Sequence, residues 1–247
     1  ARPPDQKHPF GYGKVVYFWA LIVALSVFSL GGGLTIYHGV HGLLNPTPLE
    51  DPLWSYVVLA VAFLFEGYSW NLSRRGLNKY RKDGHNLWQA VRASKDAAVF
   101  TVFIEDSAAL LGLLVAAAGI GLAQLTGDPR FDPAASVVIG LLLVAAAFTL
   151  ARETGALLVG ESIGREETGE LRDIIYADPS IDEVQRVATM QMGPDEILVT
   201  ASVKFKRGMT IDQVENAIER LENRVRAHNP AVRNLYFESA ALRSSLL

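Results

Sequence analysis

Four long apolar segments limit the folds that are open to this chain. They run from about residue 15 to 44, 54 to 72, 97 to 125 and 134 to 160, and charged residues rarely interrupt them. Each is near the ~20 apolar residues that a helix needs to cross a bilayer core. Because backbone groups in hydrocarbon must be hydrogen-bonded within the segment, we predict four transmembrane helices rather than buried helices of a large soluble protein.

The connecting segments predict how these helices are oriented. The connections 45–53 and 126–133 contain a single basic residue, Arg130, whereas the connection after the second segment is strongly basic. Its basic residues are Arg74, Arg75, Lys79, Arg81, Lys82, Arg92 and Lys95. The positive-inside rule places this connection in the cytoplasm, and by alternation residues 1–14 and the end of the chain as well. Binding of anionic lipid is an alternative use of the same charges.

The last third of the chain has the pattern of a small soluble domain. The elements expected there are a helix over Glu166–Ala177, strands over Glu183–Met192 and Ile197–Lys206, a helix opened by a capping box at Thr210–Gln213, and a strand over Val232–Glu238. We predict a membrane domain over 1–162, an α+β ferredoxin-like domain over 163–241 with its helices on one face of an antiparallel sheet, and a tail over 242–247. The apolar face of the second helix is expected at Ile211, Val214, Ile218, Leu221 and Val225.

Three carboxylates interrupt the apolar segments and are the candidate functional residues. Glu105 and Asp106 are adjacent in the third segment, and Glu66 lies in the second. A carboxylate in hydrocarbon is unfavourable by several kcal/mol, so such residues commonly face a cavity, a partner or an ion. Transport is therefore the leading hypothesis. The alternative is that these acids are neutralised by a neighbouring helix or stay protonated, and for Glu66 we weigh a hydrogen-bonded, packed carboxylic acid equally.

Composition excludes several other classes of function. The net charge of -3 is too small to indicate nucleic-acid binding, and the chain has no cysteine, so no disulfide framework or thiolate metal site is possible. The sequence has no glycine-rich phosphate loop that would indicate ATP use, and no His-Glu-x-x-His zinc motif. We therefore expect neither an enzyme nor a bound cofactor.

Four elements together resemble the cation diffusion facilitator family of zinc transporters. They are the run His8-Pro-Phe-Gly-Tyr-Gly-Lys14 before a span, the acidic residue in a later span, Asp132-Pro133 at the start of the last span, and the α+β domain that follows. Members of this family usually have six spans, so the resemblance implies that the first two are absent from this chain. It also implies a homodimer that associates through the soluble domain.

The resemblance implies two metal sites. In the transport site, Asp106 matches the Asp of a His-x-x-x-Asp motif, whose His position falls on Val102; Glu105 is the expected substitute, and Glu66 would complete or gate the site. This Glu-Asp variant is similar to a divergent branch that includes mitochondrial zinc transporters. In the second site, Asp5 and His8 match two ligands and Tyr12 stands where the family often has His. A solvated loop is the alternative there.

These observations predict a secondary transporter that exports a divalent cation from the cytoplasm. Zinc is the expected cargo, with manganese and iron as options for a carboxylate-rich site, and protons are the expected counter-ion. The predicted location is a multi-pass protein of a bacterial-type cell membrane. The alternative is a membrane scaffold or metal sensor that does not transport and signals through its cytoplasmic domain.

Overall fold

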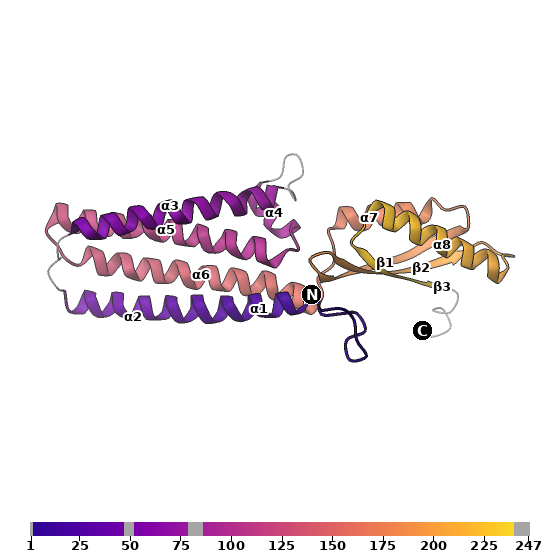
Figure 1. Cartoon of the computed structure of the whole chain (residues 1–247), viewed down its shortest axis with the longest axis horizontal. Helices are drawn as coiled ribbons and strands as arrows, with labels where there is room; N and C mark the ends of the chain where they lie inside the picture. The colour runs from indigo at the N-terminus through magenta and orange to yellow at the C-terminus, as the bar shows by residue number, and fades with distance from the viewer. Residues whose placement is uncertain (1, 47–51, 79–85, 240–247) are drawn as a thin grey trace. The chain divides into compact units, whose positions relative to one another are not determined.

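The computed structural model describes residues 2–46, 52–78 and 86–239 of the 247 residues (Figure 1). Its elements are α1 (Val15–Val23), the π-helical turn η1 (Ala24–Ser29), α2 (Leu30–Leu44), α3 (Pro52–Leu77), α4 (Leu87–Ala93), α5 (Ala97–Thr126), α6 (Phe131–Val159), α7 (Arg165–Tyr176), β1 (Ile181–Gly193), β2 (Glu196–Phe205), α8 (Ile211–His228) and β3 (Val232–Ser239). Contacts divide the chain into two compact units: Val16–Gly155, and Ala1–Val15 with Ala156–Leu247. Lys79, Arg81 and Lys82 of the basic connection, and the predicted tail 242–247, lie outside the described residues.

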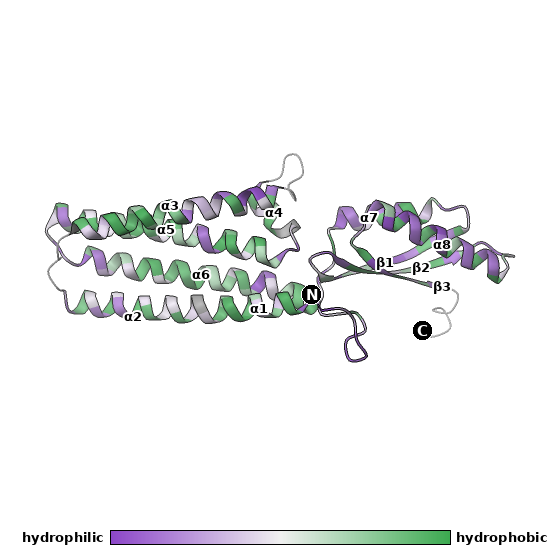
Figure 2. Cartoon of the chain, in the orientation of Figure 1, coloured by the Kyte–Doolittle hydropathy of each residue, from purple (hydrophilic) through white to green (hydrophobic). Residues whose placement is uncertain are grey.

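The four predicted spans are helical in the structure. Among the described residues, the helices over Val15–Leu44, Leu53–Leu77, Ala97–Thr126 and Phe131–Val159 are long and apolar enough to cross a membrane. Figure 2 shows this apolar character along the long helices, whereas α7 and α8 also carry many hydrophilic residues. The first span is not regular, because the π-helical turn separates α1 from α2. The expected α-helical membrane domain is confirmed.

Helices α3 and α5 pack side by side and run in opposite directions. Near one end of the pair, a side chain at Gly76 would meet Val99, and near the other end the Tyr56 hydroxyl lies 3.4 Å from the side-chain oxygen of Gln124. Helix α5 begins at Ala97, where the Asp96 side chain accepts hydrogen bonds from the backbone N–H groups of the first turn. This register brings the last third of α3, from Trp70 to Ser73, opposite the turn of α5 that carries the acidic pair.

Helices α2 and α6 approach closely enough for glycine to be required at their crossing. A Cβ atom added to Gly32 would lie 2.9 Å from the carbonyl oxygen of Gly140, and one added to Gly140 would lie 2.8 Å from that of Gly32. Both distances are below van der Waals contact. Small residues at such a crossing let two helix backbones touch, which is how helices associate in lipid without a hydrophobic driving force.

The soluble domain has the expected order of elements but not the expected sheet. The three strands lie in the order β1-β2-β3, with β1 antiparallel to β2. Strand β3 is parallel to β2, so the prediction of a wholly antiparallel sheet is wrong. The cause is the connection: β2 returns to β3 through helix α8, and a helical crossover joins parallel strands, whereas the short β1–β2 turn joins antiparallel ones. The α+β class itself is confirmed.

The core of the soluble domain lies between the sheet and the two helices. Val199, Ala201 and Val203 of β2 are fully buried, as are Leu221 and Val225 of α8. The alternating pattern in β2 and most of the apolar face of α8 are thus as predicted. Ile211 is the exception, because it is 76% exposed at the first position of α8, outside the sheet-covering stripe.

Residues 2–14 pack with the soluble domain. A Cβ atom added to Gly13 would clash with the backbone oxygen of Met192, so the segment touches the β1–β2 hairpin directly. The end of β1 is also bonded to the segment that follows α6, since the backbone N–H of Gln191 donates to the carbonyl of Glu161 at 2.9 Å. The hairpin therefore holds the segment before α1 and the segment after α6 in one unit.

Candidate functional site

Asp106 lies in the α3–α5 interface. Its side chain is only 5% exposed, and its Oδ2 atom lies 3.5 Å from the hydroxyl of Ser73, which is also buried. Glu66, two turns before Ser73 on α3, is close enough to Asp106 for the two acids to interact electrostatically. The structure therefore brings together Asp106 and Glu66, two acids 40 residues apart in the sequence.

Glu105 is the more peripheral acid. It is partly exposed, and it interacts electrostatically with both Asp106 and Glu66. Adjacent residues on a helix point about 100° apart, so Glu105 cannot share the direction of Asp106. Val102, at the position of the expected histidine, is 39% exposed and has no metal-binding atom.

The donor set within the described residues is small. No ion pair to Asp106, Glu105 or Glu66 occurs among the residues that the structure describes. Within the same residues, no group of three or more His, Cys, Asp or Glu side chains is arranged to hold a metal ion. The α3–α5 interface thus supplies two interacting carboxyl groups and a serine hydroxyl, without a basic side chain to neutralise them.

An aromatic contact beside the acids was not predicted from the sequence. The indole N–H of Trp70 donates to the Ser107 hydroxyl at 2.9 Å, and that hydroxyl donates to the carbonyl of Phe103 at 2.6 Å. The Trp70 and Phe103 rings stack at 5.9 Å between centroids, and the Arg74 guanidinium lies 5.4 Å from the indole centre. The spacing of Glu66, Trp70 and Arg74, four residues apart on one helix face, was the available sequence signal.

The second predicted site is a turn in which the Asp5 side chain is hydrogen-bonded to neighbouring residues of the same turn. The Asp5 carboxylate accepts hydrogen bonds from the backbone N–H groups of Lys7 and His8 and, at 2.7 Å, from the Tyr12 hydroxyl. The bond from Tyr12 is the main reason why the pKa of Asp5 is lowered, and it raises the pKa of Tyr12. His8 Nδ1 lies 3.4 Å from Asp5. Asp5 and His8 are therefore together, but the oxygens of Asp5 are already engaged.

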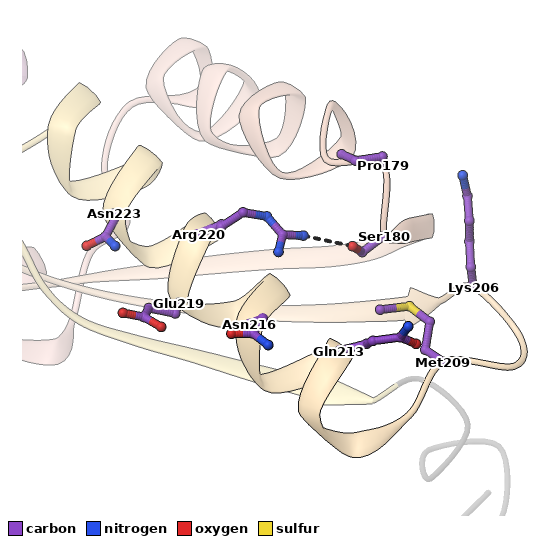
Figure 3. A pocket seen from close by; sticks show the side chains of 9 residues that line it. All are labelled: Pro179, Ser180, Lys206, Met209, Gln213, Asn216, Glu219, Arg220 and Asn223. Atoms are coloured by element: carbon purple, nitrogen blue, oxygen red, sulfur yellow. Dashed lines mark hydrogen bonds between the residues drawn. The ribbon is translucent and has the colours of Figure 1, made fainter.

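The soluble domain has a pocket whose lining differs chemically from the acidic α3–α5 interface. It has a volume of about 770 Å³ and lies between α8 and the start of β1 (Figure 3). Arg220 and Lys206 contribute positive charge, and the Arg220 guanidinium donates to the Ser180 hydroxyl at 2.9 Å. Glu219 is the single acid among its lining residues. This lining does not suit a divalent cation, so the α3–α5 interface remains the candidate cation site.

Comparison with known families decides the class of protein. The family model described as "Cation efflux transmembrane domain" matches residues 1–159. The chain belongs to the cation efflux, or cation diffusion facilitator, family. This confirms the resemblance drawn from the His8–Lys14 run and the intramembrane acids, and together with the apolar helices it makes the chain an integral membrane protein.

Relatives of this cation efflux chain come from animals, plants and bacteria. It is 35% identical over 206 residues to the "Proton-coupled zinc antiporter SLC30A9, mitochondrial" of Xenopus laevis, covering 83% of this chain and 37% of that protein. It is 30% identical to "Metal tolerance protein C4" of Arabidopsis thaliana over 85% of this chain and 46% of that protein. It is 26% identical to the "Cation-efflux pump FieF" of Escherichia coli over 89% of this chain and 70% of that protein. The chain thus spans less than half the length of the frog and plant relatives.

Proposed function

We propose that this protein carries a divalent cation, zinc by preference, across a membrane in exchange for protons. The observation that carries the proposal is the Asp106–Glu66 contact in the α3–α5 interface, which has no basic partner among the described residues. Intramembrane acids that face one another rather than lipid are typical of ion pathways. The printed names of the relatives, a zinc antiporter and a cation-efflux pump, support the same class.

The chemistry of the two acids suits exchange of a cation for a proton. Two neighbouring carboxyl groups can share one proton, because a protonated carboxyl donates and an ionised carboxylate accepts. When both are ionised they form a carboxylate pair that attracts a divalent cation. Asp106 and Glu66 would then hold the cargo in one state and a proton in the other, with remaining ligands from water or from residues outside the described set.

Carboxylate and serine oxygens leave the choice of metal open to experiment. Zinc accepts carboxylate ligands and is commonly four-coordinate, while a site rich in oxygen donors also suits manganese or ferrous iron. The basic connection after α3 supports a cytoplasmic location for residues 2–14 and the soluble domain, so the proposed direction is export from the cytoplasm. A bacterial-type cell membrane and a homodimer remain part of the proposal.

Zinc flux into proteoliposomes under a pH gradient tests this function. The complete gene product is compared with Asp106→Asn, Glu105→Ala and Leu111→Ala, a control on the outward face of α5, where Leu111 is 52% exposed. We expect flux to fall by about 100-fold in Asp106→Asn, because an ionisable ligand becomes a neutral amide. The Leu111→Ala protein should transport normally. Equal flux in Asp106→Asn and the wild type would refute the proposal.

A metal sensor that does not transport is the second candidate. The observation that favours it is Val102, which removes one expected ligand from the turn before Asp106 and is partly exposed. A sensor predicts no flux of zinc, manganese or iron in the complete protein, together with zinc binding that Asp106→Asn abolishes. The same proteoliposomes, assayed for binding by equilibrium dialysis, distinguish the two functions.

A further inference from the structure

Trp70 joins α3 to the turn of α5 that carries Asp106. Its indole N–H bonds to the hydroxyl of Ser107, the residue next to Asp106, and its ring stacks on Phe103, one turn earlier. The Ser107 hydroxyl uses its own proton on the Phe103 carbonyl, so the direction of both hydrogen bonds is fixed. The carbonyl of Trp70 also accepts from Ser73, whose hydroxyl faces Asp106. Trp70 therefore binds both the residue next to Asp106 and the serine that faces it.

Arg74 covers this indole with a positive charge. Its guanidinium carbon lies 5.4 Å from the ring centroid, within the distance at which an aromatic face attracts a cation. Its Nε atom is buried and has no hydrogen-bond partner within the described residues. Since an Arg side chain normally uses its donors when buried, the ring is the main interaction that the structure provides for this part of the guanidinium.

The order of the residues along α3 indicates where the Arg74 charge lies relative to Glu66. Glu66, Trp70 and Arg74 follow one another at single-turn intervals, and the helix ends at Leu77, just before the basic connection. Arg74, itself counted among the basic residues of that connection, thus lies one turn nearer to the end of α3 than Trp70 and two turns nearer than Glu66. A cation that approaches Glu66 along this face of α3 from the end at Leu77 therefore passes Arg74 first.

We propose that Arg74, held on the face of Trp70, is an electrostatic barrier at the entrance to the Asp106–Glu66 site from the side of the basic connection. This inference rests on the proposed transport function. The guanidinium repels a divalent cation until it leaves the indole, so the Trp70–Arg74 contact sets how readily cargo enters from that side. Trp70 is a positioning residue, because it acts through Arg74 and through the turn that carries Asp106.

Replacing the charge provides a test with a matched control. Arg74→Gln is compared with Arg75→Gln, which removes the same charge from the next residue, an exposed arginine. Zinc is presented on the side of the basic connection, and initial rates give KM and the maximal rate separately. We expect Arg74→Gln to lower KM by about 3- to 10-fold with little change in maximal rate, because a nearby repulsive charge is removed. Arg75→Gln should leave KM within about 2-fold of the wild type, since exposed charges are screened.

A double-mutant cycle then asks whether Trp70 holds the barrier in place. Trp70→Leu removes the aromatic face, so Arg74→Gln should have no further effect on KM in that background. Arg74→Lys should keep most of the wild-type KM, because it retains the charge. A thermal melt of each variant identifies any that is misfolded, and if Trp70→Leu is misfolded the Arg74–Arg75 comparison decides the proposal without it.

Two results would overturn the inference. One is an unchanged KM in Arg74→Gln, and the other is an equal change in Arg74→Gln and Arg75→Gln, which would indicate a general surface charge. If flux still depends on Asp106 in the same vesicles, the barrier is wrong and the transport function stands. If flux does not depend on Asp106, the transport function itself fails.

Discussion

Among the described residues, the membrane unit buries Asp106 and the soluble unit buries Asp178 almost completely, but the partners of the two carboxyl groups differ. Asp106 is 5% exposed and Asp178 is 3% exposed. Asp178 accepts a hydrogen bond from the backbone N–H of Ser180 at 3.0 Å, and Arg220 and Arg224 lie 3.3 and 3.7 Å from its oxygens. Asp106 has a serine hydroxyl at 3.5 Å and a second carboxyl group instead.

We interpret Asp178 as a structural carboxylate, whereas the proposed function requires Asp106 to exchange its partner. Burial raises the pKa of Asp178, but the hydrogen bonds from Ser180 and the Arg220 charge outweigh burial, and the net effect is a lowered pKa. The ionised form is thus permanently neutralised by protein groups. Asp106 has no fixed cation in the described residues, so a mobile cation or a proton can take that place. Equal burial therefore does not indicate equal function.

Among the substitutions that test this comparison, we expect the largest loss of folding stability from a change at Asp178. Asp178→Asn should destabilise the soluble domain by about 2 kcal/mol, because it leaves two arginines and a backbone donor with a weaker acceptor. Zinc flux at low temperature should stay normal in this variant. Thermal unfolding followed by circular dichroism, beside the flux assay, provides both readings. Loss of flux with unchanged stability would mean that Asp178 is not the structural member of the pair.

The same variant should also have a characteristic pH dependence. A carboxyl group with a lowered pKa stabilises the folded state at pH values above its unfolded pKa of about 3.9, and that contribution is lost as the pH falls through the folded pKa. The stability difference between the wild type and Asp178→Asn should therefore be constant near neutral pH and shrink below about pH 4. A difference that grows on acidification would contradict the lowered pKa.

The substitution Glu66→Gln tests the same comparison in the membrane unit. The substitution keeps the size of the side chain and its capacity for hydrogen bonds but removes one of the two ionisable carboxyl groups of the proposed cation site. We expect zinc flux to fall by about 10-fold, less than in Asp106→Asn, because Glu66 is more exposed and less constrained. Flux equal to that of the wild type would assign Glu66 to helix packing, the alternative that the sequence left open.

Sequence patterns predicted the helices and strands well, because the formation of each element depends mainly on its own residues. The four spans follow from their length and apolar composition, and Thr210–Gln213 does form a capping box at the start of α8. The direction of β3 was missed because strand pairing is not local: the alternation of Val199, Ala201 and Val203 is the same in a parallel and an antiparallel sheet. Helix α4, which begins after its own capping box at Asn86, was too short to stand out.

The candidate site was predicted in part for a similar reason. Asp106, Glu105 and Glu66 are conspicuous because charge is rare in apolar segments, so composition alone selects them. The register of α3 against α5 could not be read from either helix, and it is this register that pairs Glu66 with Asp106 and brings Trp70 to Ser107. Trp70 and Ser107 are ordinary residues for a transmembrane helix, so the four-residue spacing of Glu66, Trp70 and Arg74 was the only sequence signal for Trp70, and none marked Ser107.

The smallest expected effect concerns a third aspartate, Asp5, which lies on the surface and has a neutral partner. Because the Tyr12 hydroxyl is the main cause of the lowered pKa of Asp5, Tyr12→Phe should raise that pKa toward its ordinary value. Nuclear magnetic resonance of the side-chain carboxyl carbon, followed through an acid titration, measures the change. A pKa that stays where it is in the wild type would mean that the backbone donors of Lys7 and His8 determine it instead.

A second substitution at Tyr12 relates this turn to metal binding. Tyr12→His replaces a competing donor with a metal ligand beside Asp5 and His8, whose ring already lies 4.2 Å from that of Tyr12. In an Asp106→Asn background, equilibrium dialysis should detect about one more zinc ion per chain in the Tyr12→His protein than in the protein that keeps Tyr12. Equal binding in both would mean that the turn cannot open to a metal, and that the hydrogen bonds to Asp5, rather than the identity of residue 12, keep it closed. The contrast with Asp106 would then apply at the surface as well, since a carboxylate whose oxygens are occupied by fixed donors is not available to a mobile cation.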